Sequence, residues 1–391
     1  MIKISDEWKY GAIPALLIHG SIGTIYCWSL LRDYVEASIG SSCTWAFSLA
    51  IFFLGISATL LGPFIEKNVK QASFISACCF GLGMILSGIA CMIGSKLLLY
   101  IGYGVIMGIG VGIGYLSPIK TLMMWFKDNK GFASGLAIAG FGLAKVLGGP
   151  GFNYFLNHFG ISEMFIFHGL LYFLIMLIAV IYLKKPESEE QISITLKTWL
   201  DELKNIISLP KIWRYWIIFY LNITAGLAVI SNEALIFGNL GVSFRWLGWA
   251  LSLAAIFNSL GRFGVAWWSD FISNRNKIFG IILLFELIAC FLGFRFSIFI
   301  PISILLCNMG YGAMFSIMPS SLHDKYGMRN VSKIHGVVLS AWAFAGLTGN
   351  QLAHFILNIP NTNHRTVILG AGVLYAIALW LSIKLWPKKT R

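Results

Sequence analysis

The residue with the strongest chemical signal is Arg262, which lies in an apolar segment, residues 246–270, that is long enough to cross a bilayer. An arginine at the centre of a membrane helix costs about 2.5–3.5 kcal/mol on insertion scales, so it normally faces a protein interior or a wet cavity. There its guanidinium can hold a carboxylate through two parallel hydrogen bonds. We therefore expect Arg262 to bind the carboxylate of a small organic anion. The alternative is a structural arginine that reaches toward the membrane surface or pairs with Asp270.

Two acidic residues, a lysine and a histidine also fall inside apolar segments. A buried carboxylate can carry a proton, so Glu233 and Glu286 are candidates for proton coupling. Glu233 lies near the end of its segment, and it could equally form a salt bridge with Lys145 or Arg245. Glu286 could simply pair with a neighbour. His19 either belongs to a binding site or is a packing residue with satisfied ring nitrogens.

The composition indicates what kind of protein positions these residues. Of the 391 residues, 58% are hydrophobic and 12% are charged, and the mean hydropathy is +0.78, whereas a soluble domain carries about 25% charged residues. Apolar runs of about 20 residues predict spanning helices. We predict an all-α membrane protein with twelve transmembrane helices, near residues 11–31, 42–64, 72–94, 97–122, 131–156, 163–183, 212–236, 246–268, 276–294, 297–320, 332–357 and 365–386.

The net charge of +13 is explained by topology and requires no nucleic-acid partner. Most of the 29 Lys and Arg residues fall in loops or at helix ends on the side that both chain ends share, and three are assigned to the helices themselves: Lys120, Lys145 and Arg262. Basic loops remain in the cytoplasm. We therefore expect a multi-pass protein of the plasma or inner membrane with both termini cytoplasmic.

A polar break near residues 184–211 separates the predicted helices into two sets of six. Apolar residues recur within it every three or four positions, at Ile192, Leu196, Trp199, Leu200, Leu203 and Ile207. This pattern predicts an amphipathic helix that lies on the membrane or packs on the protein's own loops. We expect a six-helix bundle over residues 1–185, a linker over 186–211 and a second six-helix bundle over 212–391.

The two halves of the chain also resemble each other. Small residues recur at nearly one offset, with Gly135, Ala144 and Gly148 in the first half and Gly336, Ala345 and Gly349 in the second. The acidic loop residues Glu66 and Asp270 are separated by nearly the same offset. These matches predict parallel six-helix repeats around a midplane site.

Patterns typical of enzymes, metal sites and nucleotide sites are not found in the sequence. The seven cysteines lie in or beside apolar runs without metal-ligand spacing, which predicts neither a disulfide framework nor a metal site. The glycine-rich run at 102–116 lies within a predicted spanning helix, where small residues favour close helix packing. We expect no enzyme activity and no cofactor. We expect the protein to be a monomer. Its expected partners are a small carboxylate, the lipid bilayer and, as a further candidate, protons.

Several stretches resemble the major facilitator superfamily, and in particular its oxalate/formate antiporter branch, which is similar to the monocarboxylate transporters. They are GTIYCWSLL from residue 23, MMWFKDNKGFASGLAIAGFGLAKVLGGP from 123, GRFGVAWWSD from 261 and MPSSLHDKYGMRNVSKIHGVVLSAWAFAGLTG from 318. The resemblance implies two rocking six-helix bundles around an anion pocket. It also implies that the loops GPFIEKNVK and WSDFISNRNK act as gates, with Glu66, Lys67, Asp270 and Arg275 as gating residues.

The resemblance further implies one arginine and one lysine in the pocket. Arg262 occupies the arginine position, whereas Trp342 stands at the lysine position. Lys145 is four residues beyond Phe141, so both share a helix face. Lys145 could therefore replace the missing lysine, or it could pair with a carboxylate for structural reasons. The implied aromatic lining comprises Tyr26, Trp28, Tyr115, Phe141, Tyr311, Phe315 and Trp342, although each could equally be a packing residue.

We therefore predict a secondary carrier of small mono- or dicarboxylates that works by alternating access, as an antiporter or a proton symporter. The alternatives are a carrier of another solute on the same fold, such as an amino acid or a drug-like compound, and a membrane sensor that does not transport. The sequence leaves the anion and its coupling open, together with the direction of flux.

Overall fold

The computed structural model describes residues 5–186 and 196–384, and every regular element in these ranges is helical. The first half of the molecule, called here the N half, has six long helical segments. The first combines a π-helical segment Trp8–Ala12, α1 (Ile13–Ile22), a 3₁₀ segment Gly23–Cys27 and α2 (Trp28–Ile39). The second and third are α3 (Trp45–Lys67) and α4 (Val69–Ile93). The fourth combines α5 (Lys96–Leu99), a π-helical segment Tyr100–Met107 and α6 (Gly108–Trp125). The fifth and sixth are α7 (Lys130–His158) and α8 (Ile161–Tyr182).

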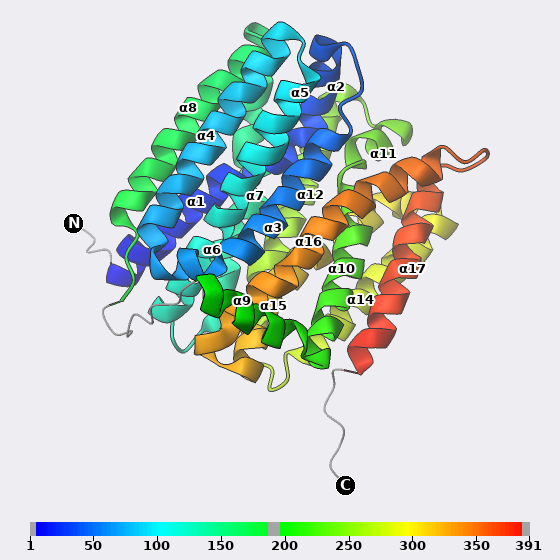
Figure 1. Cartoon of the computed structure of the whole chain (residues 1–391). Coiled ribbons are helices and arrows are strands. Elements are labelled where there is room, and N and C mark those ends of the chain that lie inside the picture. The colour runs from blue at the N-terminus through cyan, green and yellow to red at the C-terminus, as the bar shows by residue number, and fades with distance from the viewer. Residues whose placement is uncertain (1–4, 187–195, 385–391) are drawn as a thin grey trace.

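The second half, called the C half, follows the same plan after the linker helix α9 (Leu196–Ile207). Its segments are α10 (Pro210–Ile230) with the short α11 (Glu233–Asn239), α12 (Phe244–Leu260) with π-helical Gly261–Val265 and α13 (Ala266–Ser269), and α14 (Asn276–Arg295). The fourth segment combines a 3₁₀ turn Ser297–Phe299 with α15 (Ile300–Tyr326). The last two are α16 (Met328–Leu357) and α17 (His364–Ile383). Figure 1 shows the two bundles side by side, with α9 across one end.

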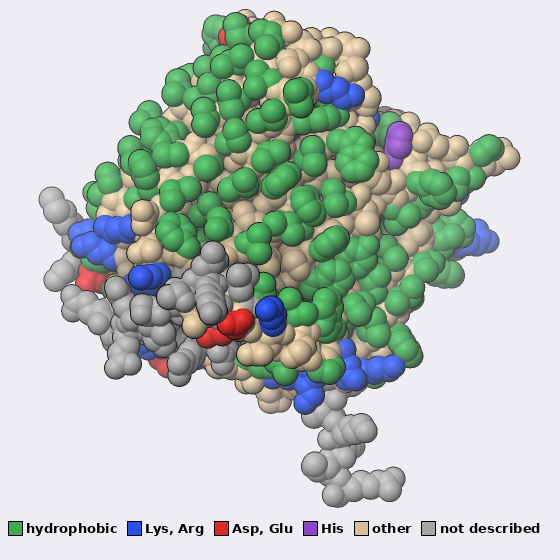
Figure 2. Space-filling view, viewed as in Figure 1, with side chains coloured by type: hydrophobic (Ala, Val, Ile, Leu, Met, Phe, Trp, Pro, Cys, Tyr) green, Lys and Arg blue, Asp and Glu red, His purple; other side chains and the backbone are tan. Residues whose placement is uncertain are grey.

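The predicted all-helical fold is confirmed, with small changes at helix ends. Eleven helices in the described residues are long and apolar enough to cross a membrane. The twelfth predicted span is α16, which has 30 residues but carries polar side chains such as His335, Thr348 and Asn350 along its length. The first helix continues to Ile39, and the seventh ends at Ile230. Exposed hydrophobic side chains cover the flank of the bundle and Lys and Arg gather near the end with the linker (Figure 2), as a bilayer requires.

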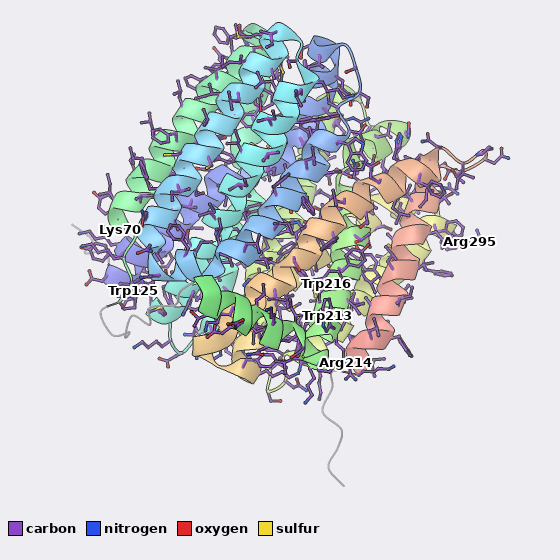
Figure 3. The ribbon with its side chains drawn as sticks, viewed as in Figure 1. Lys70, Trp125, Trp213, Arg214, Trp216 and Arg295 are labelled. Carbon is purple, nitrogen blue, oxygen red and sulfur yellow. The ribbon has the colours of Figure 1, made fainter. Side chains whose placement is uncertain are left out.

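The linker is attached to both halves at the same end of the molecule, which we call the linker end. Lys70 donates to the carbonyl of Ile181 at 3.2 Å, and the Trp125 indole donates to that of Lys184 at 3.0 Å. Trp213 donates to the carbonyl of Ile207 at 2.7 Å; Figure 3 labels these side chains. α9 also packs on α10 and α16, and Lys333 pairs with Glu202 at 2.5 Å. The predicted amphipathic helix therefore rests on the C half, while Ile192 lies outside the described residues.

The small residues that repeat between the halves make matching contacts. A side chain at Gly148 of α7 would meet Thr24 at 2.9 Å, and one at Gly349 of α16 would meet Thr224 at 2.8 Å. Each half thus packs its fifth helix on its first helix through the same close approach. These equivalent contacts are what parallel six-helix repeats would produce.

The two halves touch closely toward the linker end and diverge at the other end. The α7–α13 contact is so close that a side chain at Gly131 would lie 2.3 Å from the Ala266 carbonyl oxygen. Thr59 of α3 donates to the Gly336 carbonyl of α16 at 2.7 Å. At the opposite end, α7 and α12 enclose a cleft of about 770 Å³, lined by residues between Lys145 and Asn157 and between Leu247 and Ile256. The molecule is therefore closed at the linker end and open at the other.

Candidate functional site

Arg262 lies at the junction of the two halves, on the π-helical segment that interrupts the eighth transmembrane helix. Single π-turns of this kind are frequent at functional sites. The side chain is fully buried, and its Nε donates to the Asn258 Oδ1 at 2.7 Å. Neither terminal nitrogen makes a hydrogen bond, and within the described residues no carboxylate pairs with the guanidinium. Four N–H donors of a buried cation therefore lack an acceptor.

The backbone holds Arg262 firmly against α15. A side chain at Gly261 would lie 1.9 Å from the Met309 carbonyl oxygen, and one at Gly312 would lie 2.1 Å from the Asn258 carbonyl oxygen. Glycine at these two positions allows the two helices to pack backbone against backbone. Arg262 and the facing residues of α15 are therefore positioned as one unit.

Aromatic rings from both halves surround the guanidinium. Its central carbon lies 5.1 Å from the Phe315 ring centroid, 5.4 Å from Phe141 and 6.0 Å from Tyr311, which are cation–π distances. The hydroxyls of Tyr26 and Tyr115 also interact with it, without the geometry of a hydrogen bond. The rings fill the space beside Arg262 in this conformation.

The same rings connect the halves to each other. The Tyr26 and Tyr311 hydroxyls are 2.5 Å apart, and Tyr115 contacts Phe315 at a centroid distance of 6.2 Å. Trp342 lies within this cluster at 5.3 Å from Tyr115 and 4.4 Å from Phe315. Six of the seven predicted lining aromatics are thus brought together around Arg262. A change in the relative position of the halves must rearrange them.

Two predicted site residues lie outside this cluster or behind it. Trp28 contacts Tyr103 at 4.8 Å inside the N half and is directed away from Arg262. His19 is buried behind Tyr115, and its two ring nitrogens face the Ala137 and Tyr115 carbonyl oxygens, the latter at 3.0 Å. Both residues have the packing environments that the sequence left as alternatives, and His19 holds the backbone of the ring-bearing helices α6 and α7.

Lys145 and Glu233 form an ion pair that joins α7 of the N half to the start of α11 in the C half. Their side chains are 11% and 1% exposed. Asn308 of α15 donates to the second carboxylate oxygen of Glu233 at 3.3 Å. Among the partners considered from the sequence, Lys145 is the one that the structure places at Glu233. Lys145 also lines the floor of the open cleft.

The second acidic candidate, Glu286, is buried inside the C half. Asn222 of α10 donates to its Oε2 at 2.7 Å, and a side chain at Gly310 of α15 would lie 2.2 Å from its Oε1. These contacts are all between helices of one half. Glu286 is therefore far better placed to hold the C half together than to sense the position of the other half.

At the linker end, Asp270 connects the halves through the start of α7. Its two carboxylate oxygens accept the backbone N–H groups of Gly131 and Phe132, both at 2.9 Å. Arg275 pairs with Asp270 and also with Asp324. An acid at a helix N-terminus is electrostatically favourable, and Asp270 contacts both a helix end and a basic neighbour. Lys67 is exposed, and the Glu66 side chain lies outside the described residues.

Sequence reasoning missed the residues that support these charges. Asn258 precedes Arg262 by four positions and so shares its helix face, a signal that was available. Asn308 lies 75 positions from Glu233, and no local pattern indicates their contact.

The fold and the site define a membrane carrier made of two helical bundles. The signature of the Major Facilitator Superfamily matches residues 13–350, and the chain belongs to this family. An oxalate:formate antiporter from Oxalobacter formigenes is 26% identical over 99% of this chain and 93% of its own length, which confirms the resemblance to that branch. An apicoplast pyruvate carrier from Toxoplasma gondii is 27% identical over 38% of this chain and 34% of its own length.

The fold comparison agrees with the sequence comparison. The solved structure of a proton:xylose symporter matches with a TM-score of 0.73 at 14% identity, over 96% of this chain and 94% of its own. These relatives and neighbours are transporters, not enzymes. The protein is a multi-pass membrane transporter of this superfamily.

Proposed function

We propose that this protein moves small organic anions across the membrane by alternating access, and that Arg262 binds the carboxylate. The observation that carries the proposal is the buried guanidinium at the junction of the halves, whose terminal N–H groups have no acceptor among the described residues. A carboxylate would accept two of these hydrogen bonds and neutralise the charge. The oxalate:formate antiporter and pyruvate carrier among the relatives support a carboxylate as the cargo.

In this mechanism the anion enters from the open end, and the rings around Arg262 rearrange to admit it. Binding removes the cost of an unpaired buried cation, which lowers the barrier for the halves to rock. The linker end then opens as the Asp270 contacts to α7 separate. The basic loops favour a cytoplasmic linker end, with both termini on that side. Either exchange for a second anion or symport with a proton completes the cycle.

Uptake of radiolabelled carboxylates by proteoliposomes tests the proposal. Arg262→Gln removes two charge-assisted hydrogen bonds of about 1.5–3 kcal/mol each, so we expect anion affinity to fall by roughly 10²- to 10⁴-fold. Arg32→Gln is the matched control, because Arg32 pairs with Glu36 on its own helix and with no other acid among the described residues. Unchanged carboxylate affinity in Arg262→Gln would contradict the proposal. Uptake driven by preloaded anion or by a pH step separates exchange from proton symport.

A further inference from the structure

The Lys145–Glu233 ion pair adjoins the Arg262 site through a small cavity. This cavity, of about 20 Å³, is lined by Tyr26, Gly142, Lys145, Ile230, Glu233, Ala255, Asn258 and Asn308. Its volume suits a single water molecule. Asn258 also accepts the hydrogen bond from Arg262 Nε at 2.7 Å. The ion pair and the guanidinium are thus separated by one asparagine and one water-sized space.

The charges of this shared site sum to a single positive charge. Arg262 contributes one positive charge, and Lys145 contributes another that Glu233 cancels through the ion pair. Trp342 contributes none at the position where the resemblance implies a lysine. In a buried site of low effective dielectric, an uncompensated charge is costly. A monoanion neutralises the site, whereas a dianion would leave one negative charge buried.

We propose that Glu233 is the specificity-determining residue of this transporter, because it neutralises Lys145 and so restricts the site to monoanionic carboxylates. This inference rests on the proposed function of Arg262. Glu233 acts in two ways. It removes the second positive charge that a dianion needs, and it lines the small cavity beside Lys145 and Asn258, where it repels a dianion more strongly than a monoanion.

The test compares two anions of the same size and shape but different charge. Oxalate is a dianion at pH 7, and oxamate, in which an amide replaces one carboxylate, is a monoanion. Their affinities for the purified full-length protein are measured by calorimetry. We expect the parent protein to bind oxamate more tightly than oxalate. Glu233→Gln frees the charge of Lys145, and we expect it to raise the oxalate-to-oxamate affinity ratio at least tenfold, a change of about 1.4 kcal/mol.

Further variants separate charge from structural damage. Lys145→Gln combined with Glu233→Gln restores one net positive charge, so the ratio should return to that of the parent. Exchange of the two residues, Lys145→Glu with Glu233→Lys, keeps the pair and should keep the ratio even if Glu233→Gln does not fold. Glu163→Gln is the matched control, since it removes the same charge from an exposed helix end.

The outcomes distinguish this inference from the proposed function. A parent protein that binds oxalate at least as tightly as oxamate overturns the inference, and so does a ratio that Glu233→Gln leaves unchanged. The same comparison with succinate and succinamate covers a site that requires a longer anion. A parent protein that binds none of these carboxylates overturns the proposed function itself.

Discussion

Closure of the linker end depends on Asp270, and its replacement by asparagine should open that end. Asp270 of the C half accepts the Gly131 and Phe132 N–H groups of the N half, both at 2.9 Å. Hydrogen bonds to a charged group contribute about 1.5–3 kcal/mol each, and asparagine keeps one neutral bond of about 1 kcal/mol. Arg275 belongs to the same half as Asp270, so that pair is retained when the halves separate. We expect Asp270→Asn to weaken closure by about 2–5 kcal/mol, or roughly 30- to 4,000-fold.

Thiol labelling in membranes measures this change. Ser134 is fully buried between the halves and donates to the Ser316 carbonyl at 3.0 Å, so Ser134→Cys reports opening of the linker end. Ser252→Cys reports the cleft at the opposite end. In Asp270→Asn, the first reporter should react faster and the second more slowly. Labelling of the same variants without the introduced cysteine is subtracted, which corrects for reaction of the native cysteines.

The matched control is Asp324→Asn. Asp324 pairs with Arg275 inside the C half, and its side chain is 46% exposed, so its loss breaks no contact between the halves within the described part of the chain. We expect labelling of Ser134→Cys to stay close to that of the parent. If Asp270→Asn leaves this reporter as protected as Asp324→Asn does, the closure does not rest on the Asp270 contacts and the argument above is refuted.

Two further changes test the packing of the halves. Gly55→Ala places a methyl group 2.7 Å from Ala343 of the other half, so Ser134→Cys should be labelled faster in this variant. Gly62→Ala on the same helix meets nothing within 4 Å and should leave the labelling rate unchanged. Equal labelling rates in the two variants would contradict this expectation. Glu286→Gln should keep carboxylate uptake within about twofold, because the hydrogen bond and close contact of Glu286 lie within the C half. A loss of uptake by a Glu286→Gln protein that melts at the parent's temperature would show instead that Glu286 takes part in coupling.

Much of the fold follows from length and hydropathy. Apolar runs of about 20 residues locate the spanning helices because no other backbone arrangement satisfies its hydrogen bonds in lipid as simply. The break after Ile230 was missed, since the apolar pattern continues through Ile236 and length alone does not mark an interruption. The signal that was available is the polar pair Ser231 and Asn232.

The candidate site was less predictable than the fold. Arg262 stands out because a charge in an apolar segment is costly, and its immediate partner Asn258 follows from helix geometry. Lys145 and Glu233 are 88 positions apart on different halves, so only tertiary packing selects this pair among the alternatives. Trp28 is two residues from Tyr26, and such residues point in different directions on a helix, which explains why Tyr26 joins the rings around the arginine and Trp28 does not.

The glycine contacts of Gly261 and Gly312 have a consequence for how this transporter could diversify. These two glycines pack the helix that carries Arg262 directly against α15. The guanidinium, Tyr311 and Phe315 therefore form a single rigid body. The opposing rings, Tyr26 and Phe141, belong to the other half, so in the proposed transport cycle they would slide past this body. Substitutions of Tyr26 or Phe141 would change the space available to the rest of the substrate, while the proposed contacts of its carboxylate with Arg262 stay intact. Recognition of charge and recognition of size can therefore evolve separately.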